Sequence, residues 1–200
     1  MGDKLTFIQQ TVLLLVTFGL TTVVGGFLAA LIQHRSWRYK WETESAEKII
    51  TTARELFQEI SRLMDRRLYR ADQLYLWSCR GVQPELKAAL ENYRSAVQEW
   101  NDNINRHLSM LQIYFGKNVR EKFDFEVGAK FVDVGSLVEQ FYRAEDRVAD
   151  SVDRENIESG IRQLRLQVYH YNILMLSEIE SKAKRINTRT SVFEDIRKMF

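Results

Sequence analysis

A long uncharged stretch near the start of the chain is its most distinctive hydrophobic pattern. No Lys, Arg, Asp or Glu occurs in residues 5–34, and residues 12–32 are almost wholly apolar. A bilayer core requires about 20 such residues in helical form. The pattern therefore predicts a transmembrane segment in residues 1–35, with the span itself at about residues 8–33.

The pattern after this segment is that of a charged, all-α domain over residues 36–200. Apolar residues recur at spacings of three and four, and one Pro and nine Gly leave few breaks between helices. Because no Gly or Pro lies between Gly26 and Gly81, the first helix is expected to continue from the span. Short connections favour an antiparallel four-helix bundle. Its expected helices cover residues 36–78, 84–115, 118–149 and 154–186, followed by a short tail helix over 190–199.

A cleaved signal peptide is the competing interpretation of the apolar stretch. A signal peptide has a basic start, an apolar region of about 7–15 residues and a small-residue cleavage site. Here the apolar stretch is longer, and no Ala-x-Ala pattern follows it. We therefore expect an uncleaved anchor.

Basic residues indicate the orientation of this anchor. Only Lys4 precedes the span, whereas Arg35, Arg38, Lys40 and Lys48 follow it. The positive-inside rule then places the N-terminus outside and the domain in the cytoplasm, in a single-pass protein. Aromatic rings prefer the membrane interface, and the expected interface belt is formed by Trp37, Tyr39 and Trp41.

Two helices carry more apolar or small residues than one small bundle needs. The fourth helix is apolar in nearly every direction between Leu164 and Leu176, so either a second subunit covers it or the tail after Asn187 folds back over it. The span has small residues at spacings of four, which allow close helix packing in lipid. These packing candidates are Thr22, Gly25, Gly26, Ala29 and Ala30. A weakly polar line on the span either packs between helices or lines a pore, and it consists of Gln10, Thr17 and Thr21.

The usual catalytic and cofactor motifs are absent from the sequence. It contains no phosphate-binding Gly-rich loop, no CxxC or HExxH spacing and no nucleophile elbow. Three His and one Cys make a metal site unexpected, and no cofactor is expected. The net charge of +2 gives no general attraction to nucleic acid, so direct binding of nucleic acid is expected to be weak or absent.

A basic stripe on the first helix is a further candidate site. Arg62, Arg66 and Arg70 follow one another at spacings of four, so their side chains share one face, where like charges repel. Two explanations are open. Either acidic residues on the same helix (Glu55, Glu59 and Asp65) neutralise the stripe, or it contacts an acidic face of a neighbouring subunit or an anion.

The last long helix carries an Arg-x4-His motif at Arg165 and His170. This motif resembles that of HEPN-type RNA-cleaving domains, in which the Arg and His of two protomers meet and cleave RNA without metal. The sequence departs from the family at Leu166, where a small polar residue is usual. A His packed at an interface beside a solvated Arg is the alternative explanation. We therefore expect the pair to be vestigial and the protein not to be an enzyme.

The combination of one N-terminal span, a HEPN-like bundle and a length of 200 residues resembles the small membrane accessory proteins of type VI-B CRISPR systems. The resemblance implies a bacterial inner-membrane protein that supports an RNA-guided RNase in antiviral defence. It also implies a ring-shaped homo-oligomer that forms a pore and depolarises the membrane. A membrane-tethered ribonuclease and a passive scaffold for a soluble partner are the alternatives.

Overall fold

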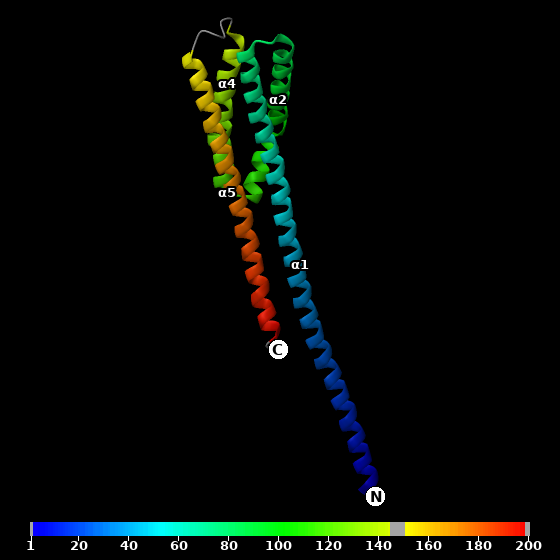
Figure 1. Cartoon of the computed structure of the whole chain (residues 1–200). Coiled ribbons are helices and arrows are strands. Elements are labelled where there is room, and N and C mark those ends of the chain that lie inside the picture. Colours follow the sequence, from blue (N-terminus) through cyan, green and yellow to red (C-terminus); the bar gives the residue numbers. More distant parts are fainter. Residues whose placement is uncertain (1, 145–150, 199–200) are drawn as a thin grey trace. The chain divides into compact units, whose positions relative to one another are not determined.

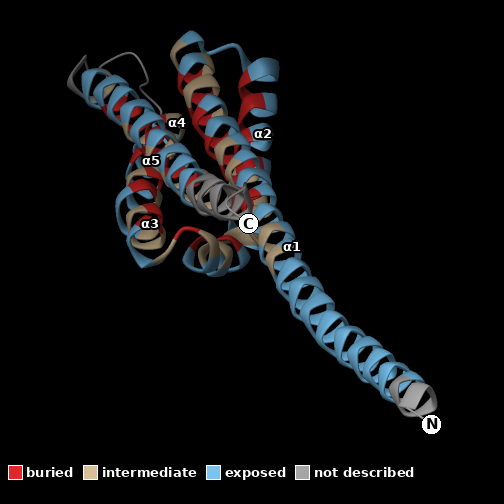
Figure 2. Cartoon of the chain, turned by 90° about the horizontal axis from the view of Figure 1, so that it is seen from below, coloured by how far each residue is buried: buried red, intermediate tan, exposed pale blue. Residues whose placement is uncertain are grey.

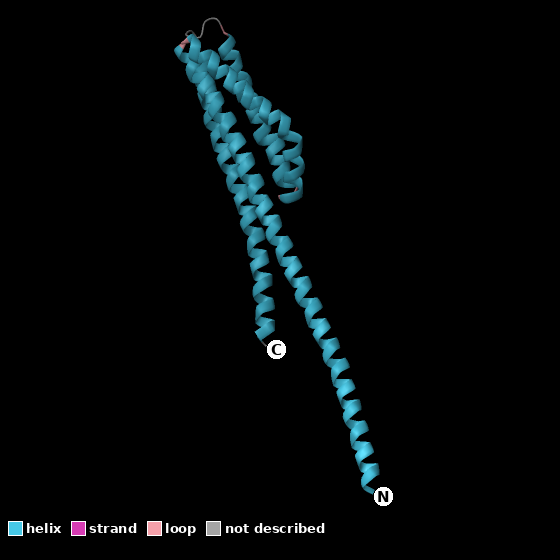
Figure 3. Ribbon diagram, turned by 90° about the vertical axis from the view of Figure 1, so that its right-hand side faces the viewer, coloured by secondary structure: helices cyan, strands magenta, loops and turns pink. Residues whose placement is uncertain are grey.

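The computed structural model describes the backbone of residues 2–144 and 151–198 and the side chains of residues 7, 9–144 and 154–186 (Figure 1). Apart from short connections, these residues are helical, and no strand occurs among them (Figure 3). The prediction of an all-α fold is confirmed. The chain divides into two compact units, residues 1–47 and residues 48–200.

The first helix, α1, runs from Gly2 to Arg80 without a break. This continuity agrees with the absence of Gly and Pro between Gly26 and Gly81. The second unit begins later than the expected boundary at residue 35, because the first buried side chain of α1 is Ile50. The first unit is therefore a single stretch of helix, and the second unit contains the hydrophobic core.

Two glycines separate α2 from its neighbours. Gly81 has a φ of +70° and ends α1, and α2 then extends over Gln83–Tyr114 with Pro in its first turn. Gly116 has a φ of +91° and directly follows Phe115, the residue that caps the C-terminal end of α2. Positive φ values are strained for residues with a Cβ, so these two glycines define the limits of α2.

The segment after Gly116 differs from the single helix expected over 118–149. It consists of α3 (Lys117–Glu121), a π-helix, η1 (Lys122–Gly128), and α4 (Ala129–Arg143). A Cβ on Gly128 would lie 3.2 Å from the carbonyl oxygen of Phe123. The small residue thus permits the wider π turn. Residues 145–149 of the expected helix lie outside the described part of the chain.

The last helix, α5, covers Ser151–Lys198 as one continuous element. We had expected a break after Asn187 and a separate tail helix over 190–199, and this expectation is wrong for the described residues. Gly160 lies inside α5, and neither Gly nor Pro follows it. No residue in this stretch therefore forces the helix to end.

In the second unit, α2, α4 and α5 lie alongside the last part of α1 (Figures 1 and 3), and their buried residues face one another (Figure 2). An aromatic cluster joins α2, η1, α4 and α5. The Trp100 ring on α2 lies 5.1 Å from Phe123 on η1 and 5.2 Å from Phe131 on α4. Tyr171 on α5 lies 5.5 Å from Phe123. This cluster holds the π-helix against the rest of the core.

Candidate functional site

The apolar segment of α1, residues 12–32, is exposed along its whole length. Its Leu, Val and Phe side chains contact no core, and among the described residues α1 is the one helix long and apolar enough to cross a bilayer. Contiguous apolar surface of this extent indicates a lipid or protein partner. The apolar segment is therefore the principal candidate site.

The two threonines of the weakly polar line form hydrogen bonds with the backbone of their own helix. Thr17 donates a hydrogen bond to the carbonyl oxygen of Leu13 (2.7 Å), and Thr21 donates one to that of Thr17. Gln10 lies on the same face and is exposed. The threonine donors are thus satisfied within the helix itself, and each hydroxyl oxygen still has a lone pair for a neighbouring helix or for water.

The packing candidates lie on an open surface. A Cβ built on Gly25 or Gly26 would meet no atom within 4 Å, and Ala29 and Ala30 are exposed. Thr22 donates a hydrogen bond to the Phe18 carbonyl oxygen, 2.8 Å away. These small residues leave room for the backbone of another helix to approach.

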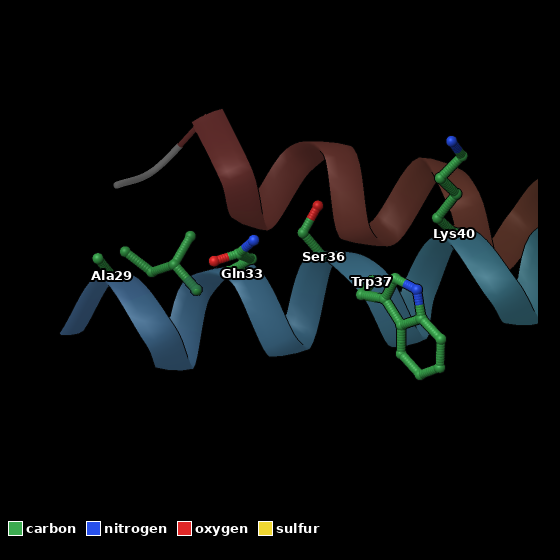
Figure 4. A pocket seen from close by; sticks show the side chains of 6 residues that line it. Ala29, Gln33, Ser36, Trp37 and Lys40 are labelled. Carbon is green, nitrogen blue, oxygen red and sulfur yellow. The ribbon is translucent and has the colours of Figure 1, made fainter. Parts of the chain in front are cut away.

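The expected interface belt directly follows the apolar segment. Trp37 and Trp41 are exposed, and Tyr39 is half-buried. A shallow recess at this end of the segment is lined by Ala29, Ile32, Gln33, Ser36, Trp37 and Lys40. In Figure 4 the Gln33 and Ser36 side chains point to the same side of the helix, and Trp37 is directed away from them. Lys40 lies 3.7 Å from Glu44, one turn further on. Rings and cations in this position suit the headgroup region of a bilayer.

Two arginines of the basic stripe on α1 pair with a carboxylate on another helix. Arg62 lies 3.3 Å from Glu99 on α2, and Arg66 pairs with the same carboxylate. Arg70 instead places its guanidinium 5.4 Å from the ring of Tyr69. The acidic partner of Arg62 and Arg66 is thus Glu99, on α2, rather than one of the acidic residues that we had proposed on α1.

Arg67 is a feature of the core that the sequence analysis did not single out. It is 6% exposed, and its guanidinium lies 5.0 Å from the rings of both Trp100 and Phe131. Burial lowers the pKa of Arg67, and nearby Tyr93 opposes this shift. Cation–π contacts with two rings offset part of the cost of burying the charge.

A second charged cluster joins α1 to α2. Arg106 Nη2 lies 2.9 and 2.8 Å from the two carboxylate oxygens of Glu59, and the buried His107 places its Nε2 3.2 Å from the same group. Partial burial raises the pKa of Glu59, but the contacts with His107 and Arg106 outweigh this effect and lower it. The cluster is therefore expected to stabilise the fold while Glu59 is ionised.

A Glu59→Gln variant tests this cluster. A lowered native-state pKa means that the ionised carboxylate stabilises the fold above its ordinary pKa of 4.5, and that this stability is lost as the pH falls below that value. We expect the variant to lose about 1 kcal/mol of unfolding free energy at pH 7 and to match the wild type near pH 3. Urea titrations at both pH values measure this, with exposed Glu55→Gln as the control. An equal loss at both values would contradict the electrostatic explanation.

The Arg165 and His170 side chains are both exposed on α5 and have different neighbours. Arg165 Nη2 lies 3.4 Å from Asp72 on α1. The His170 ring lies 5.5 Å from that of Tyr169, in an edge-on arrangement. Asp72 thus holds the Arg of the motif against α1 within the chain.

No family model, curated protein or solved structure matches this chain. In the described residues, no group of three or more His, Cys, Asp or Glu side chains is placed to hold a metal ion. The function is therefore argued from the apolar segment and from the surface of the helical unit.

Proposed function

We propose that this chain is a single-pass inner-membrane protein that assembles into a ring-shaped homo-oligomer and forms a pore. Its N-terminus lies outside, and a cytoplasmic HEPN-like antiparallel four-helix bundle receives the activating signal. In this proposal the pore depolarises the membrane and so strengthens antiviral defence by an RNA-guided RNase of the type VI-B kind. The observation that carries the proposal is the exposed apolar segment of α1.

The side chains of that segment support association within lipid. Open surface at Gly25 and Gly26 allows helices to approach closely. Residues Thr17 and Thr21 keep their donors bonded inside the helix, so this face tolerates either lipid or a narrow water-filled path. Several copies around one axis would bring the weakly polar line to the centre and the large apolar residues to the lipid.

A membrane-potential measurement tests the proposal. Cells carry the chain together with the RNA-guided RNase, and a potential-sensitive dye is followed after the target RNA is supplied. We expect rapid depolarisation that requires both proteins. An unchanged potential, with the chain present in the membrane fraction, would contradict a pore.

Two variants separate the pore from the alternatives. Exchange of residues 8–33 for an unrelated membrane anchor should abolish depolarisation, whereas a passive scaffold would keep its function. The double variant Arg165→Ala, His170→Ala should retain depolarisation if assembly is intact, because the proposed pore does not use these residues for catalysis. Loss of defence with intact depolarisation would favour the ribonuclease instead.

A further inference from the structure

The core of the helical unit contains a buried cation without an acidic partner. Among the described residues, Arg67 is the only Lys, Arg, Asp or Glu whose side chain is buried. Its guanidinium contacts the ring of Trp100 on α2 and that of Phe131 on α4. The oxygen of Tyr93 accepts a hydrogen bond from it, and its Nε has no hydrogen-bond partner within the described part of the chain.

The burial of this charge opposes the closed packing of the core. Burying a cation is costly unless a charged group compensates for it. The partner here is a neutral phenol, because burial raises the pKa of Tyr93 and keeps its hydroxyl protonated. Two rings and one neutral hydroxyl compensate only in part. Any motion that lets water reach Arg67 therefore recovers part of the cost.

One side of the cover over this cation is provided by α4. Phe131 contacts the guanidinium directly, and Gly135, one turn further along α4, lies against Tyr93. A Cβ built on Gly135 would overlap the hydroxyl oxygen of Tyr93. The absence of a side chain at this position thus allows α4 to approach closely and to cover both Arg67 and its hydrogen-bond partner.

Of the helices that pack around the cation, α4 has the weakest local support. It contains 15 residues, compared with 32 in α2 and 48 in α5. Gly135 and three Val residues lie within it, and both residue types have low helix propensity. It also follows directly on the π-helix η1, a rare type of helix that is often found at functional sites. These features make α4 the element that opens most easily.

The neighbouring helices are joined by polar contacts that do not involve α4. Ion pairs at Glu59 and Glu99 join α1 to α2, and Tyr75 on α1 donates a hydrogen bond to Glu158 on α5 (2.8 Å). These contacts remain when α4 moves. By contrast, α4 meets α2 through the stacked rings of Phe131 and Trp100, 5.2 Å apart.

We propose that α4 opens away from α1 and α2 as a local unit, with Gly128 as its hinge, and that the buried charge of Arg67 favours this opening. Gly128 lies at the boundary between η1 and α4, the kind of position that absorbs hinge motion. In the open form water reaches Arg67, and a cation beside Trp100 and Tyr93 becomes accessible. The inference concerns the helical unit alone, so it does not depend on the proposed pore.

Hydrogen exchange of the full chain in mild detergent, followed by mass spectrometry, tests the proposal. Local opening requires less free energy than global unfolding, so the amides of α4 should exchange at least about tenfold faster than the buried amides of α2 in the wild type. Arg67→Met removes the charge and keeps the length of the side chain. It should slow exchange in α4 roughly tenfold or more. Arg54→Met, at an exposed position of the same helix, is the matched control and should leave the rates unchanged.

Two results would overturn the proposal. One is equal exchange in α4 and α2 of the wild type, which indicates that the unit unfolds as a whole. The other is exchange in α4 of Arg67→Met that is as fast as in the wild type or faster, including a variant that does not fold. In that case Arg67 would hold α4 in place instead of favouring its release.

Discussion

Replacing Phe123 with alanine should lower the unfolding free energy of the helical unit by about 3–5 kcal/mol, the usual cost of removing a fully buried phenyl ring. Phe123 is 1% exposed and packs against Trp100 and Tyr171, at 5.1 and 5.5 Å between ring centres. Its loss would leave a cavity where α2, η1 and α5 meet. Denaturant titration in mild detergent, followed by tryptophan fluorescence, measures the effect.

The matched control is two residues away in the same π-helix. Phe125 is 67% exposed, so Phe125→Ala should change the unfolding free energy by no more than about 0.5 kcal/mol. The pair of variants also tests the local geometry, since both alter the same residue type in η1. Equal effects, or a larger effect at Phe125, would show that the segment packs differently.

Placing a charge in the middle of the apolar segment should have the second largest effect. Arg at the centre of a span costs about 3 kcal/mol more than Leu in membrane insertion, which is on the order of a hundredfold in the insertion equilibrium. We therefore expect Leu20→Arg to shift most of the chain out of the membrane fraction after alkaline extraction. Quantitative immunoblotting of pellet and supernatant measures the shift.

A charge near the end of the segment provides the control. Gln33 lies beside the expected interface belt, where an Arg side chain reaches the headgroups. Gln33→Arg should therefore stay in the membrane fraction like the wild type. If Leu20→Arg stayed there as well, the apolar segment would not be the element that anchors the chain.

Local patterns were sufficient to predict most of the helices. The absence of Gly and Pro between Gly26 and Gly81 indicated one long first helix. Pro84 and Gly116 marked the limits of the second helix. These signals depend on backbone geometry near each residue, so the sequence expresses them directly. The π-helix is different, because apolar residues four apart, such as Phe123 and Val127, fit both an α- and a π-helix.

Contacts between helices could not be predicted from such local patterns. Spacing on α1 showed that the arginines share a face, but nothing on α1 indicated that Glu99 on α2 would pair with Arg62 and Arg66. Arg67 carried a signal that we did not use: it lies between the buried Met64 and Ala71 at spacings of three and four. A charged residue on the apolar stripe of a helix predicts a buried cation.

The excess apolar surface of the last helix was apparent from its sequence, but its division into two faces was not. Leu164 and Leu166 look alike in the sequence, yet the first is buried in the core and the second is exposed. Only the packing of α5 against its neighbours separates them. The same packing places Arg165 against Asp72, a contact between residues far apart in the chain.

The central claim is that the apolar segment remains in the chain as a membrane span. Its most direct test is the intact mass of the protein recovered from alkaline-extracted membranes. The account predicts a pelleted chain at its full mass of 23.6 kDa. A chain found in the supernatant, or one shortened by removal of its first residues, would contradict it.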